Sequence, residues 1–102
     1  MKAVKVQYTI KAEYAETNKA NIRQVMADLR ELANPGIKYS TFVMEDGKTF
    51  VHFGIYTDQE ALDVVNNLTS FQAFREQLKA SGPEAPPKGD DLTLVGSSYE
   101  IF

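Results

Sequence analysis

The sequence predicts a single α+β domain whose elements follow the order β-α-β-β-α-β. Three observations carry this prediction: an alternating segment at the start of the chain, two segments with apolar residues at helical spacing, and an Asp-Gly turn between two further alternating segments. The 102 residues provide one core, and we expect residues 1–102 to form one domain. A domain of this size buries a modest share of its surface, so it gains stability from a partner.

The first strand is predicted from residues 4–12, where apolar and polar residues alternate with the period of two that a half-buried strand shows. The apolar positions of this strand are Val4, Val6, Tyr8, Ile10 and Ala12.

A helix should follow, because apolar residues then recur three and four positions apart. Its apolar stripe consists of Ile22, Val25, Met26, Leu29 and Leu32. Thr17 or Asn18 is expected to cap its first turn, since their side-chain oxygens can accept from free backbone amides. Asn34-Pro35-Gly36 should end it, because proline cannot continue a helix.

Residues 37–44 and 49–56 are predicted to form a hairpin around Asp46-Gly47, a strong signal for a short turn. A two-residue turn would pair Glu45 with Lys48 and place Thr41 opposite His52. One face of the hairpin would then carry Phe42, Met44, Val51, Phe53 and Ile55. The other face would carry Tyr39, Thr41, Val43, Phe50, His52, Gly54 and Tyr56.

The second helix should begin at Thr57, which with Glu60 forms a capping box. Asn66-Asn67 weakens the helical pattern and Thr69 restarts it with a second capping signature, so we expect a kinked or two-piece helix that ends near Ser81. Residues 81–91 hold three prolines and are predicted to be a loop, which could act as a lid. Residues 92–102 should form the last strand.

This order of elements is that of a ferredoxin-like fold, a four-stranded antiparallel sheet with two helices on one face. We expect the helices to cover the face with Val4, Val6, Tyr8, Val51, Phe53 and Ile55. The opposite face would then expose an apolar surface made by Tyr39, Val43, Phe50 and Tyr56. A second copy packed face to face would cover that surface, which predicts a homodimer in the form of a dimeric α/β barrel. A ligand or another protein on the same face is the alternative.

The composition excludes several classes of function. The net charge is −3 with no basic run, which argues against nucleic-acid binding, and no apolar segment has the roughly 18 residues of a membrane helix. The N-terminus lacks the pattern of a signal peptide, so a cytoplasmic protein is expected. With no cysteine and one histidine, disulfides, iron–sulfur clusters and thiolate metal sites are excluded, and neither a metal nor a cofactor is expected.

His52 is the most suggestive candidate for chemistry. A histidine that is neutral near pH 7 can act as a general base on a phenolic substrate. The alternative is a structural histidine that hydrogen-bonds to Thr41 or to a partner chain. Tyr56 is the second catalytic candidate, although buried tyrosines more often serve packing. The residues expected to line a pocket around these two are Gln7, Thr9, Tyr39, Thr41 and Phe50.

Two segments resemble the antibiotic-biosynthesis-monooxygenase-like proteins of the dimeric α/β barrel superfamily. They are residues 50–62, FVHFGIYTDQEAL, and residues 70–74, SFQAF. In that family an apolar third strand ends in an aromatic residue, and an acidic capped turn, an Ala-Leu pair and a Ser-x-x-Phe segment follow. The resemblance implies the barrel fold and oxygenation of a quinol-like substrate without a cofactor.

The sequence also departs from this family. Tyr56 stands where tryptophan is common, and Val65 where a histidine often follows the Ala-Leu pair. The haem-degrading branch uses an asparagine on the first strand, where this chain offers Gln7 and Thr9, and a helix histidine, where it has Leu78. Haem degradation is therefore not expected.

Three functional hypotheses follow. The first is a small-molecule-binding or cofactor-independent monooxygenase-like protein that acts on a flat aromatic or quinol-like compound. The second is a non-catalytic homodimeric interaction domain without a ligand pocket, in which a charge at Phe50 would break the dimer. The third is an isomerase-like member of the same superfamily. The residues leave open whether the chain is an enzyme.

Overall fold

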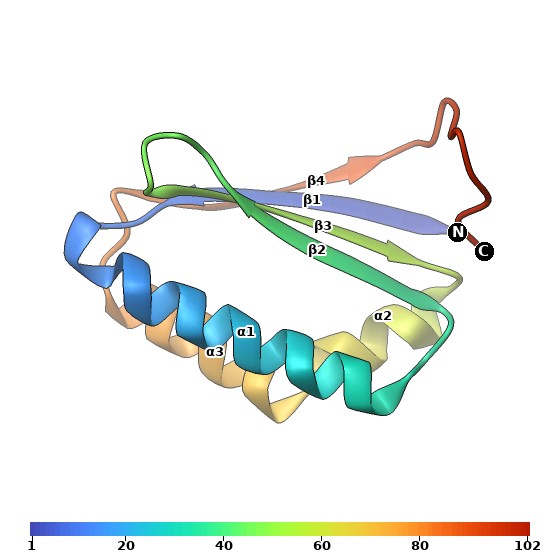
Figure 1. Ribbon diagram of the computed structural model, residues 1–102, viewed down its shortest axis with the longest axis horizontal. Helices are drawn as coiled ribbons and strands as arrows, with labels where there is room; N and C mark the ends of the chain where they lie inside the picture. The colour runs from blue at the N-terminus through green and yellow to red at the C-terminus, as the bar shows by residue number, and fades with distance from the viewer.

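A computed structural model describes residues 1–102 and contains one four-stranded sheet and three α-helices (Figure 1). In chain order the elements are β1 (Lys2–Thr9), a 3-10 turn η1 (Ala12–Tyr14), α1 (Ala15–Leu32), β2 (Ile37–Val43), β3 (Thr49–Tyr56), α2 (Gln59–Asn66), α3 (Thr69–Ala80) and β4 (Ala85–Leu92). The strands lie in the order β2-β3-β1-β4, and every neighbouring pair is antiparallel. This is the predicted α+β ferredoxin-like fold. The helices all lie on one face of the sheet, with α1 and α3 side by side (Figure 1).

The pairing of β1 with β3 corrects the predicted assignment of the two sheet faces. Val6 lies opposite His52 and Tyr8 opposite Phe50, so β1 places its apolar side chains beside those of Phe50 and His52. Because directly paired residues point to the same face, His52 faces the helices rather than the open side.

The other side of β3 consequently faces away from the helices. Val51, Phe53 and Ile55 pair with Gln7, Lys5 and Ala3, and these residues form the open face. Phe50, His52 and Tyr56 are buried, whereas Val51, Phe53 and Ile55 are half-buried. The predicted grouping of Val51, Phe53 and Ile55 with Val4, Val6 and Tyr8 is therefore wrong.

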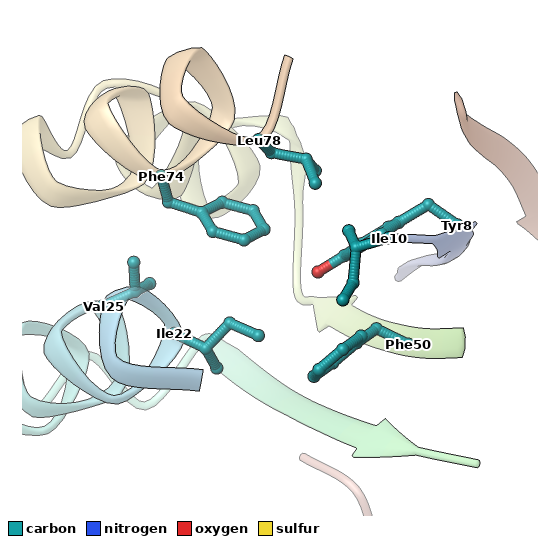
Figure 2. Packing of buried hydrophobic residues seen from close by; sticks show 7 residues of the cluster. All are labelled: Tyr8, Ile10, Ile22, Val25, Phe50, Phe74 and Leu78. Carbon is teal, nitrogen blue, oxygen red and sulfur yellow. The ribbon is translucent and has the colours of Figure 1, made fainter. Parts of the chain in front are cut away.

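The core consists of two clusters between the sheet and the helices. Figure 2 shows the larger one, in which side chains from the sheet face those of α1 and α3; its members are Tyr8, Ile10, Ile22, Val25, Phe50, Phe74 and Leu78. The smaller cluster joins the end of β3 to α2 through Tyr56, Ala61 and Val65. The stripe predicted for the first helix thus supplies Ile22 and Val25 to the core.

The two predicted helix caps differ in the structure. The 3-10 turn lets α1 begin at Ala15, ahead of Thr17 and Asn18, so Asn18 is a fully buried residue inside the helix rather than its cap. Asp58 caps α2 in place of Thr57, and its Oδ1 accepts a hydrogen bond of 2.9 Å from the backbone amide of Ala61. The shift reflects the extended backbone of Asp58, which aims its carboxylate at the free amides of the first turn.

The second helical region is in two pieces, as predicted, since α2 ends at Asn66 and α3 begins at Thr69. Leu68 precedes α3 and makes no side-chain cap hydrogen bond, so the second capping signature is not used.

The last strand is earlier in the chain than predicted. β4 covers residues 85–92, inside the expected loop, and residues 93–102 form no strand. Prolines are tolerated there because β4 is an edge strand, where an amide facing solvent need not donate to a neighbour. Residues 85–91 of the expected lid are therefore part of the sheet.

The hairpin has the predicted register but a longer turn. Thr41 pairs with His52, whereas the backbone pairing ends at Met44, whose amide donates to the carbonyl of Thr49 at 2.8 Å. Asp46 closes the turn, because one of its carboxylate oxygens accepts from the amides of Lys48 and Thr49. Glu45 and Lys48 are therefore turn residues and not a strand pair.

The sheet exposes apolar surface on its open side, as the excess of apolar residues predicted, but through different side chains. Phe42 and Met44 are more than half exposed, at 59% and 52%, and Phe42 packs edge-on against Phe53. Leu92 of β4 adds to this surface at the far edge. None of the helices has the length and apolar character required to cross a membrane.

Gly54 should be intolerant of a side chain, because a Cβ at this position would meet the ring and hydroxyl of Tyr56. We expect Gly54→Ala to lower the free energy of unfolding by about 1–3 kcal/mol, the usual cost of overpacking. Urea denaturation of both proteins measures this difference. Gly89→Ala on β4 is the matched control, since its Cβ would meet only Val6 at 3.9 Å. Equal losses in the two variants would contradict the packing of Tyr56 over Gly54.

Candidate ligand-binding site

A cavity of about 550 Å³ lies between the sheet and α3. Its volume is within the range of small-molecule sites, which is roughly 300–1,000 Å³. The floor is formed by buried side chains of the central strands, including Tyr8 and His52. The rim carries exposed residues, including Arg75 and Pro86, so the cavity runs from solvent to the buried histidine.

His52 is the centre of a buried hydrogen-bond network that joins three strands and α1. Its Nε2 lies 2.8 Å from the Tyr8 hydroxyl, and its Nδ1 lies 2.8 Å from the Tyr39 hydroxyl and 3.1 Å from Thr41 Oγ1. Asn18 Nδ2 donates to the Tyr8 hydroxyl oxygen at 2.9 Å. The interior of the cavity thus contains polar groups that are held in fixed positions.

The distances of this network fit one consistent order of protons. Tyr8 accepts from Asn18 and can donate its own hydroxyl hydrogen to His52 Nε2. In the tautomer that accepts this hydrogen bond, the ring proton of His52 is on Nδ1 and is donated to Tyr39 or Thr41. Tyr39, which lines the cavity, can in turn donate its hydroxyl hydrogen to a bound molecule.

Burial keeps the groups of this network uncharged. It lowers the pKa of His52 from 6.5 to about 4, because the imidazolium would lose its hydration. Burial also raises the pKa values of Tyr8 and Tyr39 far above the ordinary value for tyrosine. At neutral pH the cavity therefore offers neutral hydrogen-bond donors and acceptors, and His52 is a weaker base than an exposed histidine.

Aromatic rings surround these polar groups. Phe71 meets Tyr39 edge-on with 6.1 Å between ring centroids, and Phe74 lies 5.4 Å from the His52 ring. Both phenylalanines come from α3 and line the cavity, Phe74 being buried and Phe71 half-buried. A flat aromatic molecule could stack or meet these rings edge-on while it reaches the Tyr39 hydroxyl.

The structure brings together only part of the predicted site. Tyr39 and His52 line the cavity, and Thr41 contacts His52 from behind without lining it. Phe50 stacks on Tyr8 with 5.7 Å between centroids and supports the floor.

Three predicted site residues lie elsewhere. Gln7 and Thr9 project from the open face of the sheet, where they pair with Val51 and Thr49, because the β1–β3 register separates them from His52. Tyr56 shares the helix-facing side with His52 but packs in the smaller core cluster, outside the cavity. Burial raises its pKa to about 12.

The sequence-based interpretation missed Tyr8, Asn18, Phe71 and Phe74 as site residues. Tyr8 looked like an ordinary core residue of the first strand, and Asn18 like a helix cap. The signal available in the sequence was the position of Asn18, four residues before Ile22 and therefore in line with the apolar stripe, because a polar side chain on the buried face of a helix requires a partner in the core. No three His, Asp or Glu side chains come together in an arrangement that could hold a metal ion.

Comparisons with known proteins agree with the fold. No protein-family model and no curated protein matches the sequence. Among solved structures, an antibiotic biosynthesis monooxygenase is 19% identical and superposes with a TM-score of 0.76, covering 94% of this chain and 100% of its own. Rv0793 from Mycobacterium tuberculosis is 19% identical with a TM-score of 0.79, covering 96% of this chain and 98% of its own.

A third solved structure is a variant of SnoaB, a cofactor-independent oxygenase from Streptomyces nogalater. It is 14% identical with a TM-score of 0.72, and 97% of each chain is covered. The chain therefore has the fold of the antibiotic biosynthesis monooxygenase structures over almost its entire length, as the resemblance of residues 50–62 and 70–74 implied. At these identities the likeness defines the fold and leaves the activity to be argued from the site.

The stability of the protein should depend on pH through His52. Its pKa is about 4 in the folded protein and 6.5 when unfolded, so the unfolded state binds the proton more readily. The contribution of His52 to the free energy of unfolding is complete above pH 6.5. This contribution falls as the pH drops toward 4, by about 3 kcal/mol in total.

The His52→Gln variant isolates this contribution, because the carboxylates that titrate in the same range are present in both proteins. Urea denaturation from pH 7.5 to 4 should show a smaller loss of stability in the variant than in the parent protein. Parallel pH profiles would mean that His52 is not buried in its neutral form.

Proposed function

We propose that the protein is an oxygenase-like protein that binds a flat aromatic or quinol-like compound in the cavity beside His52. The cavity itself is the observation that carries this proposal, because it combines an aromatic wall with fixed hydrogen-bonding groups at its floor. Such a combination suits a planar ligand with an oxygen substituent, whose ring replaces water against Phe71 and Phe74. The likeness to the fold of SnoaB, a cofactor-independent oxygenase, supports the oxygenase-like part of the proposal.

The network gives Tyr39 and His52 distinct roles in this proposal. Tyr39 contacts the ligand oxygen, while His52 holds the Tyr39 hydroxyl in place through Nδ1. Tyr8 and Asn18 position His52 from the other side. A general-base role for His52 is weakened by its low pKa and by the three hydroxyl groups that already occupy its ring nitrogens.

Oxygenation without a cofactor places a demand on the substrate. The substrate itself must supply the electrons that reduce O₂, so that one oxygen atom enters the product and the other leaves as water. An electron-rich quinol or polyphenol meets this demand. The protein would contribute orientation and exclusion of water, which suit a cavity whose interior groups are neutral and fixed.

The open face of the sheet supports a second part of the proposal, a homodimer. The apolar side chains of Phe42, Val51, Phe53 and Ile55 lie on the face opposite to the helices, where a second sheet could cover them. The ligand cavity lies on the other face, so assembly and ligand binding use different surfaces. A charge at Phe50 would disrupt the core and would not act on the dimer surface, because Phe50 belongs to the core next to the helices.

Binding of a quinol is the first test. Calorimetric titration with 1,4-naphthohydroquinone, anthrone and catechin under nitrogen should show at least one ligand that binds in the cavity. Tyr39→Phe should raise the Kd of that ligand by about threefold to tenfold, which corresponds to the loss of one neutral hydrogen bond. Tyr99→Phe is the control, since Tyr99 is 68% exposed in the C-terminal segment. Admission of isotopically labelled O₂ should then yield product with one labelled atom, faster than autoxidation alone.

Two results would overturn this proposal. One is the absence of binding by every member of the panel, and the other is an equal effect of the two tyrosine substitutions.

A charge on the open face tests the homodimer. Phe53→Glu should convert the protein from dimer to monomer, because burying an unpaired carboxylate in an apolar interface is costly. Val95→Glu is the control, since Val95 is fully exposed outside the sheet and should leave the dimer intact. Sedimentation equilibrium measures both masses. A parent protein that sediments as a monomer would refute the homodimer.

A further inference from the structure

We propose that the ligand of this cavity carries a negative charge next to its aromatic ring, and that Arg75 and Lys79 at the rim select it. This inference rests on the proposed function and specifies the class of ligand. The charge would be that of a carboxylate or of an ionised enol or phenol. Arg75 and Lys79 would act as specificity-determining residues and not as part of a reaction.

The charged residues around the cavity are of one sign. Arg75 and Lys79 are the charged residues that line it, and no carboxylate does. The protein as a whole is acidic, with a net charge of −3. A generally basic surface therefore does not explain the two cations at the rim. The two residues are four positions apart on α3, which places them on the same face of the helix, one turn from each other.

Neither cation is neutralised by the protein. The ion pairs of the structure join Lys19 to Glu16, Lys48 to Glu84 and Lys88 to Asp90, and leave both Arg75 and Lys79 without a carboxylate partner. Glu84 directly follows Pro83, which lines the cavity. Its carboxylate does not pair with Arg75 or Lys79, because it lies 2.9 Å from the ammonium group of Lys48. The positive charge at the rim is therefore available to a ligand.

Arg75 is also held in place beside the aromatic wall. Its guanidinium carbon lies 4.8 Å from the centre of the Phe71 ring, and its Nη2 donates to the backbone carbonyl of Asn66 at 3.3 Å. Phe71 in turn meets Tyr39, so the guanidinium, the ring and the hydroxyl follow one another from the rim to the floor. A cation over a ring that is itself part of the cavity wall can reach the anionic end of a ligand stacked nearby.

The neutral interior complements these cations. Burial is the largest influence on the pKa of Tyr39 and raises it, and neighbouring Tyr56 and Tyr8 add to the rise, whereas the charge of Arg75 acts in the opposite direction. The field of Arg75 thus reaches the hydroxyl that would contact the ligand. Because His52 and Tyr39 remain neutral, the interior is poor at removing a proton from a ligand, and an already ionised ligand would be bound through Arg75 and Lys79.

Matched pairs of ligands test the charge directly. The first pair is 2-naphthoate and 2-naphthamide, which differ by the charge of a carboxylate. The second pair is 2-hydroxy-1,4-naphthoquinone, ionised at pH 7.5, and its neutral 2-methoxy ether. Calorimetric titration of the full chain at pH 7.5 and low salt gives the ratio of the two Kd values in each pair. We expect the anion of at least one pair to bind about tenfold more tightly, the value of a charge-assisted hydrogen bond.

Substitutions of Arg75 and Lys79 test whether these rim residues cause the preference for the anion. Arg75→Gln should reduce the ratio from about tenfold to about twofold, and Lys79→Gln should reduce it by a smaller factor. Lys38→Gln is the matched control, because it removes an exposed lysine of β2 that does not line the cavity, and it should leave the ratio unchanged. Thermal melts followed by circular dichroism confirm that all three variants are folded, as expected for exposed positions.

The outcomes separate this inference from the proposed function. A preference for anions that is lost in Arg75→Gln and retained in Lys38→Gln supports the inference. Equal binding of the charged and neutral members in both pairs overturns the inference and leaves the aromatic cavity as proposed. Equal loss of preference in Lys38→Gln and Arg75→Gln also overturns it, since the effect would then be general electrostatics. Absence of binding by all four compounds counts against the proposed function itself.

Discussion

The hydrogen bond between Tyr8 and His52 is the interaction on which the rest of the site depends. It joins the two central strands on the face covered by the helices, where an unpaired imidazole or hydroxyl would be costly. Its presence requires that Val6 and Tyr8 share a face with His52, and therefore that Val51 and Phe53 point to the open side. One cross-strand contact thus fixes which half of β3 becomes core and which half remains exposed.

The division of β3 between two faces separates two physical tasks. The helix-facing side combines a packed core with a cavity whose interior polar groups, Tyr8, Tyr39 and His52, are neutral and mutually hydrogen-bonded. The open side carries apolar side chains that the helices of the same chain cannot reach. A ligand and a second sheet would therefore not compete for the same surface. A substitution on the open face would leave the ligand cavity in place, and a substitution in the cavity would leave the open face in place.

The electrostatics of the cavity follow from its depth. At the floor, burial disfavours any charged form and keeps His52 and Tyr39 neutral. The floor therefore contributes to ligand binding mainly through the fixed positions of its hydrogen-bonding groups. At the rim, Arg75 and Lys79 are exposed to solvent and are the charged residues of the lining. A site with neutral depth and a cationic rim favours a ligand that is apolar at one end and anionic at the other, an asymmetry that a plain aromatic pocket would lack.

The sequence by itself determined the order of elements, the hairpin register of Thr41 with His52 and the break between α2 and α3, because alternation, helical spacing and turn chemistry are local signals. It could not determine which face of β3 meets the helices, since both faces are apolar enough to be core and the choice depends on the pairing with β1, over forty residues away in sequence. The position of β4 was misjudged for a related reason: prolines indicate a loop locally, yet an edge strand tolerates them. Only the tertiary structure brought Asn18, Tyr8, His52 and Tyr39 together, because a hydrogen-bond network between distant elements leaves no periodic trace in the chain.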